Sequence, residues 1–522
     1  MAVASRAKIL TAGFAASLLC STCLISAQAQ IKASESRITA ISVTGVQQVG
    51  SYNGVAYVRT YGMVKGVVDA NEDVVGLAGL PKNAAGKFEY STEFEIIAPA
   101  TGQPRNEVIF IDAENRGGAV MLNLVNEAGV SGPPSRAQYT DGLGNGFFQR
   151  HATSYARVQW QTKIAKDVPE TAQGVGLVIM RDFARMLAGY TAASSTDGYL
   201  PGTYAKLILG GKSQSSWMVN DFIAEGFNVE PIVGKGIFQG AISVDGLGHW
   251  MALNNLAAKH NVPQHPYIAP DEKPLQKAEL LNRTETDPVF VDVAAYTDFY
   301  RLRAGLSDVA VSTPKYRRYD IPGPHGSQRP PVRKEAFDDC NNGQPTPLNP
   351  VSMSPYIRAQ IIGIEKAIGV KAAQDGPTLP PSVVFKLGPA PKSTANFNPL
   401  AGANVQVPLT DKNAWPVGGV RFPDAEFPLG KPVPVSLPPV ITTSIDDTCG
   451  NRGQFQPYTT AELNQKYGSK EKYLELYQGQ IQKLVAQGHL LAEDEQAMLG
   501  YAEYLWDHAE NYLVTPQSAS TN

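Results

Sequence analysis

Residues 204–228 read YAKLILGGKSQSSWMVNDFIAEGFN and predict a buried strand, a tight turn and a helix in direct succession. The apolar run at 207–209 is typical of a buried strand. Apolar residues then recur on one face of a helical segment, and Gly226 supplies a stop signal. A serine in such a strand-to-helix turn is held out in the open, above the carboxyl edge of a sheet.

Only one serine in this turn has small residues two positions before and after it. Ser213 is flanked in this way by Gly211 and Ser215, whereas the two later candidates would have Trp217 or Met218 two positions ahead. The pattern departs from the commoner G-x-S-x-G because a serine replaces the second glycine. It therefore indicates a nucleophile at Ser213, and the alternative is a phosphate-binding or plain surface turn.

The composition indicates a large globular protein. The chain has 522 residues, of which 43% are hydrophobic and 18% charged, and its net charge is −3. This balance argues against a nucleic-acid-binding protein and against a disordered chain. We expect one large catalytic domain with elaborations, and many turns and loops because Gly and Pro are abundant.

The first residues are typical of a signal peptide. Arg6 and Lys8 precede a long apolar run that ends in Ala27-Gln28-Ala29, a pattern that predicts cleavage after residues 1–29. A membrane anchor is the alternative, and no other stretch is long and apolar enough to span a bilayer. The prediction is therefore a periplasmic or secreted protein without a membrane span after signal cleavage.

Two cysteines remain after signal cleavage, Cys340 and Cys449. In an exported protein such a pair most simply forms a disulfide bond. It would close a loop of about a hundred residues, which stabilises the fold by about 4–5 kcal/mol in the chain-entropy model. Two free thiols or a metal site are the alternatives, and no Cys/His cluster with ligand spacing supports a metal.

The rest of the chain predicts an α/β protein. Residues 38–110 alternate apolar and polar residues and indicate β-strands. Strands alternating with helices then point to a largely parallel sheet with its chemistry at the carboxyl edge. Further strands are predicted at 108–111, 155–160, 236–246, 286–299 and 315–327, and a helix at 174–190.

These patterns divide the mature chain into two parts. Residues 30–330 form the predicted catalytic core. Residues 331–522 form an extension packed on that core, loop-rich over 331–458 apart from a helix at 355–373, and helical over 459–513. In the helical part, Ser469 is a candidate cap at the start of a helix and Gly488 a candidate stop.

A serine nucleophile needs a base and an acid that orients the base. In the chain order that belongs to this kind of elbow, the acid and then the histidine follow the serine. His325 lies in Pro322–Gly326, directly after the last predicted strand, and is the candidate base. Asp298 follows the strand before it and is the candidate acid, with Asp292 and Asp308 as alternatives. The histidines assigned instead to connecting or terminal helices are His249, His260, His265, His489 and His508.

An oxyanion formed at Ser213 needs N–H donors nearby. The backbone N–H of Gln214 is one candidate, and Gly117 in the Arg116–Gly118 loop after the strand at 108–111 supplies the other. Such donors are each worth about 3–4 kcal/mol toward a tetrahedral intermediate. This chemistry needs no metal and no organic cofactor.

Several short motifs lie in order along the chain, at 111–117, 145–161, 181–182, 213–215, 226–228, 322–325, 340, 380–381, 418–423 and 449–450. Together they resemble the secreted bacterial alpha/beta hydrolase-domain proteins. The resemblance implies the α/β-hydrolase fold and a Ser–acid–His triad at Ser213, Asp298 and His325. Where that family tends to have an S/T-E-x-D run after the strand, this chain has Ala-Tyr-Thr-Asp at 295–298, so the glutamate is missing.

The sequence thus predicts an exported serine hydrolase that cleaves carboxylic esters, on a small-molecule or polymeric substrate. An amide hydrolase or acyltransferase with the same triad is one alternative, and a non-catalytic binding protein on a hydrolase scaffold is another. Loops and the insertion at 247–285 are expected to form the pocket walls and to set specificity.

Overall fold

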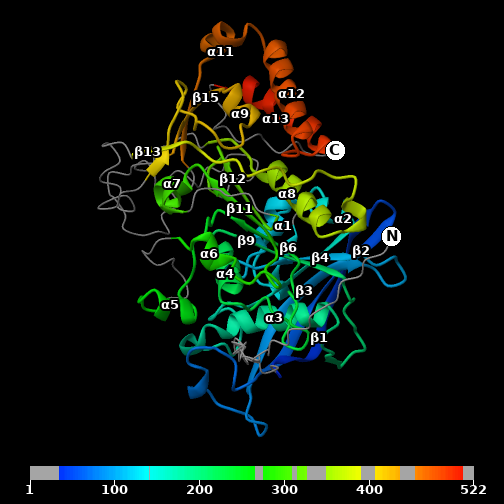
Figure 1. Cartoon of the computed structure of the whole chain (residues 1–522). Helices are drawn as coiled ribbons and strands as arrows, with labels where there is room; N and C mark the ends of the chain where they lie inside the picture. Colours follow the sequence, from blue (N-terminus) through cyan, green and yellow to red (C-terminus); the bar gives the residue numbers. More distant parts are fainter. Residues whose placement is uncertain are drawn as a thin grey trace, which may run out of the picture. The chain divides into compact units, whose positions relative to one another are not determined.

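The structure is a computed structural model that describes residues 35–139, 142–264, 274–307, 314–325, 349–389, 406–434 and 453–509 (Figure 1). The described residues belong to one compact unit. The predicted signal peptide, both cysteines of the predicted disulfide and the alternative acid Asp308 lie outside the described residues. No helix in the described part of the chain is long and apolar enough to cross a bilayer.

A ten-stranded sheet organises the molecule, in the order β12-β11-β10-β9-β4-β7-β3-β2-β1-β8. The strands are β1 Arg37–Tyr52, β2 Val55–Val68, β3 Phe88–Pro99, β4 Val108–Asp112, β7 Thr153–Val158, β8 Ser194–Ser195, β9 Lys206–Lys212, β10 Gly240–Val244, β11 Val289–Ala295 and β12 Tyr316–Ile321. From β7 to β12 every neighbouring pair is parallel, so these strands end at one edge of the sheet. The expected mostly parallel sheet is confirmed.

The β-rich start of the chain joins this same sheet in the opposite sense. β1 pairs with β2, β2 with β3 and β3 with β7, each antiparallel. β1 turns into β2 through Asn53 and Gly54, both with positive φ (49° and 79°), as a tight hairpin turn requires. The N-terminal strands therefore extend the central sheet rather than forming a separate one.

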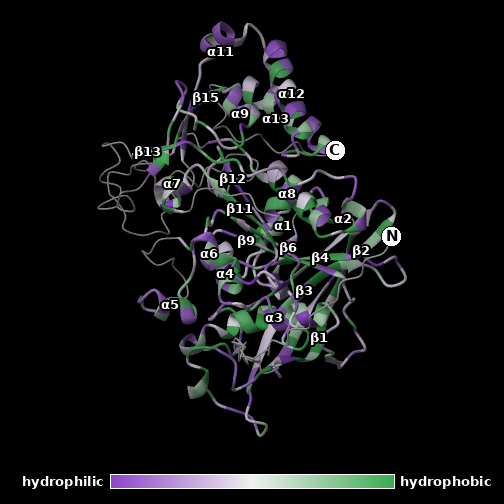
Figure 2. Ribbon diagram, viewed as in Figure 1, coloured by the Kyte–Doolittle hydropathy of each residue, from purple (hydrophilic) through white to green (hydrophobic). Residues whose placement is uncertain are grey.

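Helices cover both faces of the sheet, because the parallel strands are apolar on both sides. In β4, Val108 and Phe110 pack into one core, whereas Ile109 and Ile111 pack into another. This explains why β4 is a continuous apolar run and not an alternating one. Figure 2 shows hydrophobic residues concentrated along the strands and on the helices that pack against them. The helices of this part are α1 Val120–Val125, α2 Phe147–Arg150, α3 Val175–Leu187, α4 Gln214–Ala224, α5 Asn255–Lys259, α6 Lys277–Leu280, α7 Asp298–Arg301 and α8 Ser354–Ala367.

The helical end of the chain shares the core of α1 and α8. Ile481 and Leu484 belong to the same hydrophobic cluster as Ile357 of α8. Arg358 fixes the contact, since its guanidinium binds Asp494 at 2.6 and 3.2 Å. The elements of this region are α9 Pro423–Glu426, α11 Thr460–Tyr467, α12 Lys470–Ala486 and α13 Glu495–Asp507, with the short strand pairs β13 Leu387–Pro389 with β14 Gln406–Pro408 and β15 Gly430–Val433 with β16 Gln454–Pro457. Another short pair, β5 Val130–Ser131 with β6 Gln138–Tyr139, follows α1 earlier in the chain.

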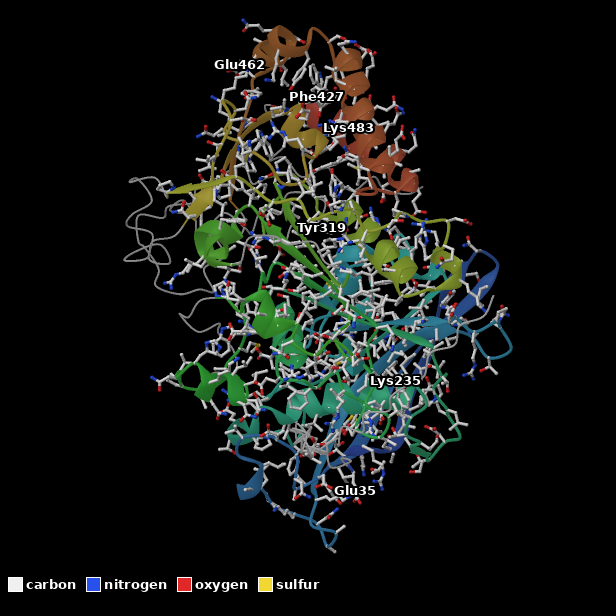
Figure 3. All side chains as sticks on the ribbon, in the orientation of Figure 1. Glu35, Lys235, Tyr319, Phe427, Glu462 and Lys483 are labelled. Atoms are coloured by element: carbon white, nitrogen blue, oxygen red, sulfur yellow. The ribbon has the colours of Figure 1, made fainter. Side chains whose placement is uncertain are left out.

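The two signals predicted for α12 are both present. The Ser469 side chain accepts the backbone N–H of Lys472, and the helix ends at Ala486, two residues before Gly488. Side chains labelled in Figure 3 include one from the interior and one from the surface. Tyr319 of β12 is 1% exposed in the interior, while the labelled Glu462 is exposed at the periphery.

Candidate active site

Four chemically capable residues follow four neighbouring parallel strands. Ser213 follows β9, Asp245 follows β10, Asp298 follows β11 and His325 lies just beyond β12. These strands are adjacent in the order β9-β10-β11-β12. Because parallel strands end at the same edge, the four residues gather at the carboxyl edge of the sheet.

Ser213 lies at a strained corner between β9 and α4. Its backbone has φ 57° and ψ −131°, a conformation that side-chain-bearing residues rarely adopt. The Ser213 N–H donates to the carbonyl of Val244 at 2.9 Å, which ties the corner to β10. Ser213 itself is partly exposed, whereas residues 214–224 of α4 are buried. This is the geometry of a nucleophile elbow.

The serines around Ser213 have structural contacts. Ser215 Oγ accepts the N–H of Lys212 and donates to the Lys212 carbonyl, both at 3.0 Å. Ser216 Oγ donates to the Ser213 carbonyl at 2.6 Å. The serine that replaces the second glycine therefore closes the turn by hydrogen bonds across it.

The residue two positions before Ser213 must be glycine, because a side chain there would clash with the first turn of α4. A Cβ built on Gly211 would lie 2.4 Å from the Ser215 carbonyl oxygen and 2.8 Å from the Ser216 nitrogen. Both are backbone atoms, which a rotamer change does not move. This steric conflict explains why a glycine stands at position 211, two residues before Ser213.

His325 and Asp298 form a hydrogen-bonded pair. The imidazole Nδ1 lies 2.7 Å from Asp298 Oδ1, and both side chains are buried. Asp298 Oδ2 accepts the backbone N–H of Ala295 at 2.8 Å, and Thr297 Oγ1 accepts the backbone N–H of His325 at 2.7 Å. With Nδ1 donating to the carboxylate, Nε2 is the nitrogen left to accept a proton.

The alternative acid Asp292 lies within β11 and faces other partners. It is buried, and the hydroxyl of Tyr316 donates to its Oδ2 at 3.4 Å. Burial raises the pKa of Asp292 to about 7, against the opposing effect of Arg318. Of the two described acid candidates, Asp298 is therefore the one hydrogen-bonded to His325.

In the Arg116–Gly118 segment after β4, one backbone N–H has no hydrogen bond within the described residues. The Arg116 N–H donates to Gln161 Oε1 at 3.1 Å, and the Gly118 N–H donates to the Asn115 carbonyl at 2.8 Å. Within the described part of the chain, no hydrogen bond uses the N–H of Gly117, which has φ 83°. Of the three N–H groups in the Arg116–Gly118 segment, that of Gly117 is therefore the candidate donor to a ligand.

A buried charged group holds this loop. Arg157 of β7 donates to the Gly117 carbonyl at 3.0 Å and pairs with Glu95 at 3.2 Å. Glu114, directly before the loop, lies 3.8 Å from the same guanidinium. Burial raises the pKa of Glu114 to about 8 and that of Asp112 to about 7. No local sequence pattern distinguishes Arg157, because its partners come from separate parts of the chain.

His249 lies in the loop after β10, not in the connecting helix or cap predicted for it. One ring nitrogen, Nε2, forms a short hydrogen bond with the Leu302 carbonyl. Burial lowers the pKa of His249 to about 4, and the nearby Arg303 and His325 act in the same direction. His249 is thus a neutral group packed near His325.

Asp245 is a residue of this edge that the sequence did not predict as part of the site, because it lies in the predicted strand at 236–246. One of its carboxylate oxygens lies within 4.8 Å of both a carboxylate oxygen of Asp298 and an imidazole nitrogen of His325. A usable signal existed: an acidic residue directly after the strand that follows the elbow.

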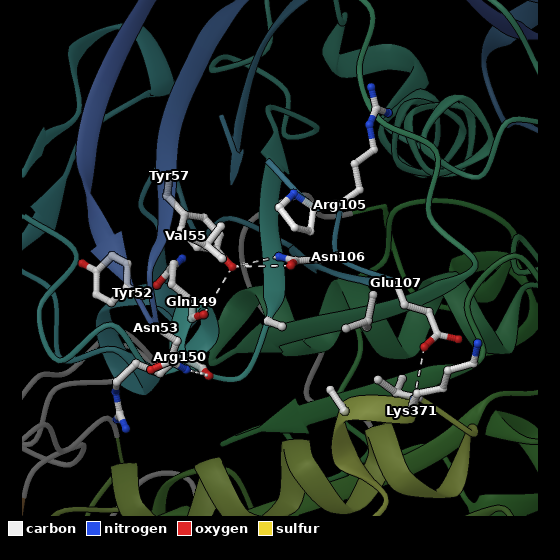
Figure 4. A pocket seen from close by; sticks show the side chains of 15 residues that line it. Tyr52, Asn53, Val55, Tyr57, Arg105, Asn106, Glu107, Gln149, Arg150 and Lys371 are labelled. Carbon is white, nitrogen blue, oxygen red and sulfur yellow. Dashed lines mark hydrogen bonds between the residues drawn. The ribbon is translucent and has the colours of Figure 1, made fainter. Parts of the chain in front are cut away.

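A separate cavity of about 280 Å³ opens near the amino ends of β4 and β7 (Figure 4). Tyr52, Tyr57, Asn106, Gln149 and Lys371 are among its lining residues. The Tyr57 hydroxyl bonds to the Asn106 side chain and the Gln149 carbonyl, as the dashed lines show. Since Ser213 lies at the carboxyl edge, this cavity is not part of the candidate active site.

The chain belongs to the alpha/beta hydrolase domain family, whose model matches residues 120–500, more than half of the chain. The sheet begins well before that match, because β1 to β4 precede residue 120. No curated protein matches the chain.

Solved structures of two esterases show distant similarity. The chain is similar to a glucuronoyl esterase from Solibacter usitatus at 10% identity, over 51% of this chain and 72% of that chain, with a TM-score of 0.27. It is also similar to an esterase from Pyrobaculum calidifontis at 10% identity, over 53% and 76%, with a TM-score of 0.23. Neither similarity carries an argument about substrate.

Proposed function

We propose that this protein is an exported serine hydrolase that cleaves carboxylic esters, with Ser213 as nucleophile, His325 as base and Asp298 as its orienting acid. The observation that carries the proposal is the His325–Asp298 hydrogen bond of 2.7 Å at the sheet edge where Ser213 occupies a strained corner. Family membership supports a hydrolase, and the ester substrate is the finer part of the proposal.

In the proposed reaction, Ser213 Oγ attacks the ester carbonyl carbon while its proton passes to His325 Nε2. The carbon–oxygen bond to the alcohol then breaks, and the leaving oxygen takes the proton from His325. Water attacks the acyl-enzyme, giving one proton to His325, and the acid departs as Ser213 Oγ recovers that proton. Asp298 stabilises the imidazolium that forms in both halves and stays ionised.

The negative oxygen of each tetrahedral intermediate needs two donors. We assign them to the backbone N–H groups of Gln214, the first residue of α4, and Gly117. Two observations support this assignment. No hydrogen bond among the described residues uses the Gly117 N–H, and the guanidinium of Arg157 binds the Gly117 carbonyl, which holds this residue in place before substrate binds.

A fluorophosphonate probe tests the proposal directly, since it phosphonylates an activated serine without needing the natural substrate. The mature protein is expected to be labelled at one serine, located by peptide mass spectrometry at Ser213. Ser213→Ala should lose the label, while Ser215→Ala, a neighbour whose hydroxyl binds only the turn, should keep it. Labelling at another serine, or none, would reject the triad.

A panel of p-nitrophenyl esters and matching p-nitroanilides then separates ester from amide hydrolysis. We expect turnover of the esters alone. Preferential anilide turnover would indicate the amide-hydrolase alternative, and labelling without turnover of either would indicate acyl transfer. Mass spectrometry of the protein recovered from the producing cells tests export, with a mature chain starting at Gln30 as the expected result.

A further inference from the structure

A second carboxyl group lies beside the His325–Asp298 pair. One carboxylate oxygen of Asp245, one of Asp298 and one imidazole nitrogen of His325 lie within 4.8 Å of one another. Asp245 is 0% exposed, so bulk water does little to screen its charge. Asp298 Oδ1 already binds Nδ1 at 2.7 Å, so Asp245 is an additional acidic group facing the same ring.

The backbone fixes Asp245 in this place. Its N–H donates to the Val293 carbonyl of β11 at 2.9 Å, and the preceding Val244 carbonyl accepts the Ser213 N–H at 2.9 Å. Asp245 has φ 58°, a left-handed conformation in which Asp and Asn are enriched over other side-chain-bearing residues. The same short segment thus connects the corner of Ser213 to β11, the strand that precedes Asp298.

The other charged or titratable groups near the ring do not supply this negative charge. His249 lies in the same loop as Asp245 and is neutral, because burial lowers its pKa to about 4. Arg303, which acts electrostatically on His249, is a cation. Among the described residues, the acidic groups that form a cluster with His325, with ligand atoms within 4.8 Å of one another, are Asp298 and Asp245.

We propose that Asp245 is a positioning residue that, together with Asp298, stabilises the positively charged form of His325 during the reaction. The effect of Asp245 on catalysis rests on the proposed function, whereas the electrostatic interaction between Asp245 and His325 does not. An opposite charge at about 4–6 Å raises the pKa of a histidine by about one to three pH units. Part of the basicity of His325 therefore comes from the end of β10.

Titration of His325 measures this interaction even in a protein without activity. Histidine labelled with ¹⁵N is followed by NMR in Ser213→Ala and in Ser213→Ala with Asp245→Asn, and loss of one signal in His325→Gln assigns the ring. Asn suits the left-handed turn, so the backbone is preserved. We expect the midpoint of His325 to fall by about one pH unit when Asp245 is replaced.

The matched control is Asp221→Asn, which removes another buried carboxyl, one on α4 whose oxygens accept the Met251 N–H. It should leave the His325 midpoint unchanged. Asp245→Gly gives the same measurement should the Asn variant fail to fold, because glycine adopts φ 58° without strain. An unchanged or raised midpoint in the Asp245 variants would overturn the proposal.

In the active protein, the acid limb of kcat/KM should move to lower pH by the same amount in Asp245→Asn. Below the midpoint His325 is protonated and cannot take the proton of Ser213, so a lower midpoint extends activity toward acid. The plateau should fall about tenfold, since the imidazolium of the transition state loses a partner. A purely structural residue would lower the plateau without moving the limb. Failure of probe labelling at Ser213 would reject the proposed function and leave the His325 titration to decide this inference.

Discussion

Substitution of Gly211 by alanine tests whether the corner at Ser213 needs a small residue two positions earlier. The new Cβ would lie 2.4 Å from the Ser215 carbonyl oxygen, whereas ordinary contact begins at 3.4 Å, so the turn must open by about 1 Å. The obstacle is backbone at the start of α4, and the displacement therefore moves Ser213 and the Gln214 N–H together.

A misplacement of about 1 Å in a catalytic group costs roughly a hundredfold in rate. We therefore expect Gly211→Ala to lose about a hundredfold in the rate of fluorophosphonate labelling and in kcat/KM for p-nitrophenyl acetate, equivalent to about 2.7 kcal/mol of transition-state stabilisation. Overpacking should also destabilise the fold by about 1–3 kcal/mol, measured by denaturant unfolding.

The control is Gly479→Ala in α12, where a Cβ meets nothing within 4 Å. It should keep full labelling and gain about 0.5–1 kcal/mol of stability, because alanine favours a helix over glycine. If Gly211→Ala folds and is labelled within threefold of the unchanged protein, the steric reasoning that selects Ser213 is wrong.

Three further variants test the supporting structure. Asp298→Asn should lose about ten-thousandfold in kcat with little change in Tm, because an amide that donates to Nδ1 leaves His325 in the wrong tautomer; retention of more than a tenth of the activity would argue against the pair. Glu114→Gln should stabilise the protein at pH 8 and leave it nearly unchanged at pH 4 in urea unfolding. In the folded protein, burial raises the pKa of Glu114 to about 8. Ionisation of this carboxyl therefore weakens the fold only as the pH rises from the pKa of Glu114 in the unfolded chain toward 8. An equal effect at both pH values would contradict this. Arg358→Leu should cost about 3–5 kcal/mol, since it leaves the buried Asp494 carboxylate without its cation; a loss below 1 kcal/mol would show that this ion pair does not hold the C-terminal helices.

Local features of the chain were read correctly from the sequence because each depends on neighbours a few residues apart. The apolar runs of β4 and β9, the cap at Ser469 and the stop near Gly488 are of this kind. The prediction of Ser213 rather than a neighbouring serine as nucleophile also rests on a local feature, the space between Gly211 and the first turn of α4, and probe labelling tests it.

The sequence did not predict which strands pair with each other or which side chains meet across the sheet. The alternating residues at 38–110 predict strands, but not that β3 pairs antiparallel with β7 and so extends the central sheet. Arg157 holds the loop of Gly117 from the strand next to β4, and no local pattern announces that contact.

The sequence alone determined that a serine would stand at a bent strand-to-helix junction, with an acid and a histidine following later strands, because steric size and periodicity act over short distances. Only the tertiary structure decided that the end of β10 lies between the ends of β9 and β11, which brings Asp245 to His325. Strand order is fixed by packing and hydrogen bonds across the whole sheet, and a residue distant in the chain becomes a neighbour only when that sheet has formed.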